Sequence, residues 1–195
     1  LSGISHIPVQ RVEGEGEKEQ VKVCGLMGGH SGAEIDKNRA NANKLMGRFL
    51  YGLKKKAEYA LISLTGGQKD NAITRECTAE FLTDSVAEVK TYAKELQEQL
   101  REEYTGSDEN ITFEITEKGT ATAEVLHPTS QEKIVFYLQN VPFGIQKMSG
   151  TIKGLVETSS NIGILRLDRD ELFASSSVRS SVDAACSALS DKIEY

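Results

Sequence analysis

Two amphipathic helical patterns, each set between strand-like runs, constrain the fold of this chain most. Over residues 42–53 apolar side chains recur every three or four positions, and the same spacing returns over residues 86–104. The flanking runs have the apolar content of strands and cover residues 19–24, 59–64, 72–82 and 111–115. In chain order these elements predict strand, helix, strand, strand, helix, strand, which is the ferredoxin-like βαββαβ arrangement.

A second unit is predicted to follow this core. A helical pattern over residues 128–141 precedes two strand-like runs, 161–167 and 171–181, and a last helical pattern covers residues 182–193. Residues 1–19 indicate an irregular lead-in with at most a short edge strand. We therefore expect an α+β fold: an antiparallel β-sheet with helices packed on one face, whose ferredoxin-like core is enlarged by a second helix/hairpin unit.

Composition excludes several classes of partner. The 195 residues suit one domain, and with a net charge of −6 and no basic run beyond residues 54–56 we expect no nucleic acid partner. No apolar run approaches the roughly 18 residues that span a bilayer, so we expect no membrane partner. The three cysteines are odd in number and far apart, which favours reduced thiols in a cytoplasmic protein.

The glycine-rich segment GLMGGHSG, residues 25–32, is the most informative stretch for function. It joins the first strand-like run to the first helical pattern, and its glycines let the backbone turn sharply and a partner approach closely. Ser31 and Glu34 have the spacing of a capping box, so we expect a helix to begin here, directly after His30. An imidazole in this place suits a functional role, although a glycine-rich turn with a hydrogen-bonded histidine explains it equally well.

Two further polar residues, Asn71 in a loop and Arg179 within a strand-like run, are candidate ligand-binding groups. With His30 they suit an anionic or carbonyl-bearing ligand, because arginine forks onto carboxylates and His or Asn can donate to an oxyanion. Each also has a structural explanation, a turn cap for Asn71 and a surface ion pair for Arg179. A Ser/His/Asp triad stays open, since its members need only be close in space, but no GxSxG elbow is present.

Metal binding by this chain is not predicted. Its three histidines lie far apart, and none has an acidic residue or a cysteine at short ligand spacing. The glycine-rich loop also lacks the lysine and the spacing of the common phosphate-binding loops. The sequence therefore indicates a set of hydrogen-bond donors without a catalytic centre of their own.

Three stretches of this sequence resemble the aminoacyl-histidine (Xaa-His) dipeptidases, a family of co-catalytic zinc metallopeptidases. The most specific is GLMGGHSGAEI at residues 25–35, followed by NANKL at residues 41–45. The second runs from the glycine pair at 66–67 to NAITRE at residues 71–76. The third joins KGLVETSSNIG, residues 153–163, to VRSS, residues 178–181, so the resemblance covers most of the chain from about Val21 to its end.

The resemblance implies a lid rather than a catalytic domain. Enzymes of this family hold two zinc ions in a catalytic domain, into which a lid that often mediates dimerisation is inserted. By the resemblance, His30 would stabilise the tetrahedral oxyanion when the lid closes, Asn71 would bind the substrate backbone, and Arg179 would bind its terminal carboxylate. Thr74 departs from the family pattern, which usually has proline there.

We therefore expect residues 1–195 to be a single lid domain, excised from a larger two-domain peptidase that hydrolyses dipeptides of the Xaa-His type. The expected partners are the dipeptide substrate, the chain's own catalytic domain and a second copy in a homodimer. The zinc ions would lie in the missing catalytic domain, none would be bound by this chain, and the chain alone would be inactive. Two alternatives stay open: the lid of a related tripeptidase or amidohydrolase, and a non-catalytic α+β module for dimerisation or ligand sensing.

Overall fold

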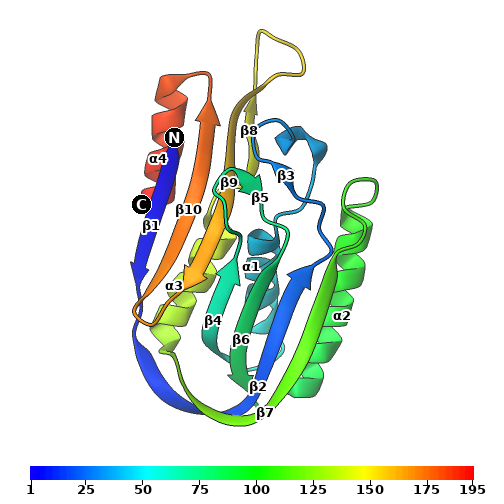
Figure 1. The fold of residues 1–195 in the computed structure, drawn as a ribbon, viewed down its shortest axis with the longest axis vertical. Helices are drawn as coiled ribbons and strands as arrows, with labels where there is room; N and C mark the ends of the chain where they lie inside the picture. The colour runs from blue at the N-terminus through cyan, green and yellow to red at the C-terminus, as the bar shows by residue number, and fades with distance from the viewer.

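The computed structural model describes residues 1–195, and most of its strands lie in one long antiparallel sheet (Figure 1). The order across this sheet is β1-β10-β9-β4-β6-β2-β7, and β8 pairs with β9 beside that path. The bounds are Ser2–Pro8 (β1), Arg11–Cys24 (β2), Ala60–Gly66 (β4), Cys77–Thr83 (β6), Thr112–Leu126 (β7), Gly144–Met148 (β8), Val156–Leu167 (β9) and Glu171–Ser180 (β10). Two short strands, β3 (Gly29–His30) and β5 (Ala72–Ile73), form a separate small sheet.

The ferredoxin-like core is present as predicted. The chain passes through β2, α1 (Ala42–Leu53), β4, β6, α2 (Val86–Glu103) and β7, and these strands take the spatial order β4-β6-β2-β7. The crossover through α1 leaves room for one strand between β2 and β4, which are parallel to each other. β6 fills that room, because it returns antiparallel to both of them.

The second unit extends the same sheet instead of forming another layer. It contains α3 (Pro128–Asn140), the strands β8, β9 and β10, and α4 (Asp183–Glu194). β9 joins it to the core by antiparallel pairing with β4, where Leu167 lies opposite Leu64. β1 then pairs with β10 and forms the outer edge.

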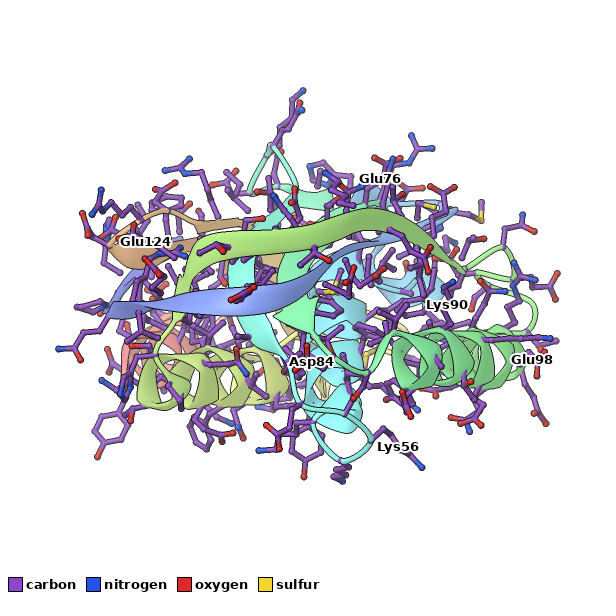
Figure 2. All side chains as sticks on the ribbon, turned by 90° about the horizontal axis from the view of Figure 1, so that it is seen from below. Lys56, Glu76, Asp84, Lys90, Glu98 and Glu124 are labelled. Atoms are coloured by element: carbon purple, nitrogen blue, oxygen red, sulfur yellow. The ribbon has the colours of Figure 1, made fainter.

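The helices pack on one face of the sheet, which confirms the predicted α+β architecture. Figure 2 shows the helices gathered beneath the strands, with Glu98 of α2 on the helical side and Glu76 on the other side. The layer between sheet and helices contains fully buried aromatic and aliphatic side chains from both units, including Phe49, Phe81, Leu100 and Ile134. None of the helices has the length and apolar character needed to cross a membrane.

Several strands differ from the sequence prediction: β8 was not predicted, β9 begins at Val156 and not at residue 161, and others differ in length or partner. β1 is the expected short edge strand, but β2 already begins at Arg11 and β7 continues to Leu126, because each supplies the other with a long ladder of partners. The glycines and glutamates of residues 13–19 disfavour a strand locally, and this long-range pairing overrides them. The predicted strand 72–82 is divided into β5 and β6, since β5 pairs with β3 outside the main sheet.

Candidate functional site

The loop between β2 and α1, residues 25–41, is closed at its base by Asp108. One carboxylate oxygen of Asp108 accepts from Met27 N at 3.2 Å, and the other accepts from Ala40 N at 3.1 Å. Burial raises the pKa of this carboxyl group, and the two N–H donors oppose that rise. The sequence did not predict this role of Asp108. It shows only that an acidic residue stands in the turn after the second helical pattern.

The turn that follows His30 orients its imidazole ring. His30 Nδ1 accepts from the backbone N–H groups of Gly32 and Ala33, each at 3.1 Å. A ring nitrogen that accepts carries no proton, so the neutral imidazole is protonated at Nε2. His30 is exposed, and this Nε2–H is left free to donate to a ligand.

Glu34 and Arg39 hold the backbone on both sides of His30. Glu34 Oε2 accepts from His30 N at 2.7 Å, while Glu34 Oε1 lies 2.8 Å from Arg39 Nη1. The same Arg39 nitrogen donates to Gly28 O at 2.7 Å. The His30 N–H, followed by the Arg39 guanidinium, lowers the pKa of Glu34.

The predicted capping box at Ser31 is wrong as a helix start. Glu34 reaches back to the preceding backbone as expected, but Ser31 Oγ is buried and makes no hydrogen bond. Only a short 3₁₀ turn, Ile35–Lys37, follows, and the helix α1 begins at Ala42. Its N-cap is Asn41, whose side chain accepts from the backbone N–H groups of Asn43 and Lys44.

Asn71 lies directly beside His30. Its carbonyl oxygen accepts from Ser31 N at 3.0 Å, and the next residue, Ala72, is the strand partner of His30. The Asn71 residue is exposed and its side chain makes no hydrogen bond within the chain. Its carboxamide is therefore available to a ligand that contacts His30.

A buried amide and hydroxyl network fixes the Asn71 turn on β9. Asn161 Nδ2 donates to Asp70 O at 3.0 Å and to Ala72 O at 2.9 Å, so it holds the backbone on both sides of Asn71. Thr74 Oγ1 accepts from Asn43 Nδ2 and lies 3.1 Å from Gly163 O. The hydroxyl group of Thr74 thus anchors this turn on β9.

Arg179 reaches the same loop from the second unit. A methyl group placed on Gly32 would lie 3.0 Å from Arg179 Cζ, so the guanidinium lies against the glycine two residues after His30. Arg179 is exposed and forms no ion pair, so the surface ion pair considered for it is absent. The fold therefore brings together His30, Asn71 and Arg179, which are far apart in the sequence.

A polar hollow opens beside this group of donors. It has a volume of about 940 Å³ and is lined by residues 66–69 and 72–76, on either side of Asn71, and by polar side chains of β4 and β6, among them Thr65, Thr78 and Glu80. Thr78 and Glu80 alternate with the buried Ala79 and Phe81, so the hollow lies on the sheet face away from the helices. The hollow borders the turn that carries Asn71, but His30, Asn71 and Arg179 are not among the residues that line it.

The residues of this chain do not form a site for zinc, which the family resemblance places in a separate catalytic domain. Nowhere in the chain do three or more His, Cys, Asp or Glu side chains gather as a metal site would require. Its functional groups are an imidazole N–H, a carboxamide and a guanidinium. The chemistry available to them is the binding and orientation of carbonyl and carboxylate groups.

Three comparisons with known proteins show which proteins this chain is similar to. Residues 21–108 match the family model described as a peptidase dimerisation domain, which includes His30 and Asn71 but not Arg179. The chain is 31% identical over 181 residues to the cytosol non-specific dipeptidase of Escherichia coli (strain K12), an overlap of 92% of this chain and 37% of that protein. It is 28% identical to the crystal structure of the aminoacylhistidine dipeptidase from Vibrio alginolyticus, with a TM-score of 0.92 over 98% of this chain and 40% of that one. The chain thus spans well under half the length of these relatives.

Proposed function

We propose that this chain is the lid of a dipeptidase, because residues 21–108 match a model of a peptidase dimerisation domain and the chain has the fold of the matching part of an aminoacylhistidine dipeptidase. The observation that carries the proposal is the meeting of His30, Asn71 and Arg179 at one end of the sheet. In this proposal, residues 1–195 are one lid domain of a larger two-domain enzyme. The catalytic domain lies outside this range.

His30 is assigned the stabilisation of the oxyanion that forms when a peptide carbonyl is attacked. The assignment is supported by the free Nε2–H, which needs no change of tautomer to donate to negative charge. It is also supported by the rigid turn, since a donor held in place loses little orientational freedom during the reaction. Closure of the lid would bring this donor to the substrate and exclude water.

Arg179 and Asn71 are assigned to the substrate on either side of the scissile bond. The unpaired guanidinium of Arg179 suits a terminal carboxylate, which it can bind through two parallel hydrogen bonds. The carboxamide of Asn71 suits the peptide backbone, because it offers both a donor and an acceptor. All three groups belong to one chain.

The remaining parts of the proposal concern the whole protein. The two zinc ions are assigned to the catalytic domain, and no role given to the lid depends on a metal bound to it. A cytoplasmic enzyme is supported by the similarity to the Escherichia coli cytosol non-specific dipeptidase, and a homodimer by the match to a peptidase dimerisation domain.

The experiment that tests the function is a substrate panel on the full-length protein. Xaa-His dipeptides, the corresponding dipeptide amides and tripeptides are compared by kcat and KM. We expect hydrolysis of dipeptides and a raised KM for the amides, since the amide lacks the carboxylate that Arg179 would bind. Preference for tripeptides would favour the related-lid alternative, and no hydrolysis at all would favour a non-catalytic module.

The 195-residue chain by itself is the matched control. With zinc supplied, we expect it to bind no metal tightly and to hydrolyse none of these substrates. Tight zinc binding with turnover would contradict the two-domain proposal.

A further inference from the structure

We propose that Glu34 and Arg39 are positioning residues for His30, a role that rests on the proposed oxyanion function of that histidine. Glu34 binds the backbone N–H of His30, and Arg39 binds Glu34 and the carbonyl of Gly28. Both act on the backbone that carries the imidazole, and through it on the direction of Nε2–H.

The geometry gives each Glu34 oxygen a different task. Oε2 accepts from His30 N at 2.7 Å, which fixes the backbone at the imidazole itself. Oε1 meets Arg39 Nη1 at 2.8 Å, so the guanidinium holds the carboxylate in this orientation. Ionised donors and acceptors form shorter and stronger hydrogen bonds than neutral ones, which suits a contact that must define an orientation.

Arg39 completes the arrangement from the other side of the turn. Its Nη1 donates to Gly28 O at 2.7 Å as well as to Glu34, so one guanidinium joins the residues on both sides of Gly29 and His30. The Arg39 side chain is only 17% exposed. A Cβ on Gly29 would lie 2.5 Å from Arg39 Nη1 and 2.6 Å from Glu34 Oε2, so the pair closes over this glycine.

This pair is distinct from the support that Asp108 gives to the loop. Asp108 binds the N–H groups of Met27 and Ala40, at the base, and makes no hydrogen bond to His30. Loss of the Glu34 side chain would leave the Asp108 contacts at the base of the loop in place and would release the backbone at His30. We therefore expect the loop to stay folded, while the direction of the His30 Nε2–H bond becomes less well defined.

The test is a double-mutant cycle in the full-length enzyme, with kcat and KM measured for an Xaa-His dipeptide. Glu34→Ala should lower kcat by about 10- to 100-fold at unchanged KM, since small misplacements of a catalytic group cost this much. In the His30→Ala background the same change should lower kcat no further, because a positioning residue acts only through the group that it positions. Glu34→Gln keeps an oxygen that can accept from His30 N and should recover part of the loss.

Asp36→Ala is the matched control, an exposed acidic residue of the same loop that makes no ion pair, and it should leave kcat unchanged. An equal loss of kcat from Glu34→Ala with and without His30 would overturn the inference, because it would mean a general structural role. If Glu34→Ala had a normal kcat while His30→Ala had a lowered one, the positioning role would be overturned and the oxyanion role of His30 would stand. A normal kcat for His30→Ala would overturn the oxyanion role and this inference together.

Discussion

The guanidinium of Arg179 lies against Gly32, a residue of the turn that orients the His30 imidazole. These two residues come from different units of the fold, Gly32 from the loop before α1 and Arg179 from β10. They meet because β9 pairs with β4 on one side and with β10 on the other. The relationship requires the second unit of the fold, since the ferredoxin-like core alone ends before Arg179.

The role of Arg179 predicts an effect on binding more than on turnover. Arg179→Ala in the full-length enzyme should raise KM by about 10- to 100-fold, the loss expected for a hydrogen bond to a charged group. The variant should also lose the discrimination between dipeptides and dipeptide amides. Arg166→Ala, an exposed arginine of β9, is the control and should change neither. An unaltered KM would count against carboxylate binding.

The role of His30 predicts the opposite kinetic signature. His30→Ala should lower kcat by about 10²- to 10³-fold, as loss of one oxyanion donor does, with a smaller change in KM. His6→Ala is the control, because His6 is an exposed histidine on β1 that pairs with Glu171. The comparison is made by steady-state kinetics on the full-length protein, and an unchanged kcat for His30→Ala would remove the oxyanion role.

The backbone at Gly29 predicts a strict requirement for glycine. Gly29 has φ of +134°, and a Cβ there would collide with Arg39 and Glu34. Gly29→Ala should lower the free energy of unfolding by about 1–3 kcal/mol, the cost of a strained backbone. Gly150→Ala, with no atom near its added Cβ, should change it by less than about 0.5 kcal/mol. Denaturant unfolding of both variants provides the comparison, and equal midpoints would contradict the expected strain.

The carboxylate of Asp108 predicts a stability effect at the base of the loop. Asp108→Asn leaves one acceptor oxygen for two backbone donors, so either Met27 N or Ala40 N faces an NH₂ group. Since Asp108 is 1% exposed, the unpaired donor should cost about 1–3 kcal/mol in unfolding free energy. Asp84→Asn, at an exposed aspartate, should be neutral. Thermal unfolding distinguishes the two, and a neutral Asp108→Asn would mean that the loop closes without this contact.

The hydrogen bond from His30 N predicts a pH-dependent loop. The pKa of Glu34 lies below its ordinary value of 4.5 in the folded chain, so the contact adds stability above pH 4.5 and loses it as pH falls through the lowered pKa. In an NMR titration of the chain, the His30 amide proton should move when Glu34 is protonated. The same signal in Glu34→Gln should not follow that titration. A wild-type signal that stays constant through the acid range would show that the hydrogen bond is not formed.

Much of the fold could be predicted from hydrophobic periodicity. The helices over residues 42–53 and 86–103 appear where their apolar spacing places them, because each buries one face on the sheet. The alternation of helices and strands was enough to predict the ferredoxin-like order. Residues 13–19 were not predicted as part of a strand, because their pairing with β7 depends on a partner more than 90 residues away.

The site residues could be proposed from the sequence, but the parts that hold them could not. His30, Asn71 and Arg179 stand in motifs with recognisable neighbours. Asp108 and Arg39 carry no such signal, since a carboxylate that binds two backbone N–H groups and a guanidinium folded over a glycine depend on where the loop comes to rest. The wrong prediction of a helix start at Ser31 has the same cause. Ser31 and Glu34 have the spacing of a capping box, but a loop follows them and the helix begins only at Ala42.

The pairing of β1 with β10 has a consequence for how this domain is made. Ser2 finds its strand partner at Ser177, and Pro8 finds its partner at Glu171. During synthesis β1 must therefore wait, unpaired, until almost the whole domain has emerged, whereas β4 and β6 can form their hairpin early. Contacts of such long sequence separation are slow to form, so docking of the first strand is expected to be a late event in folding.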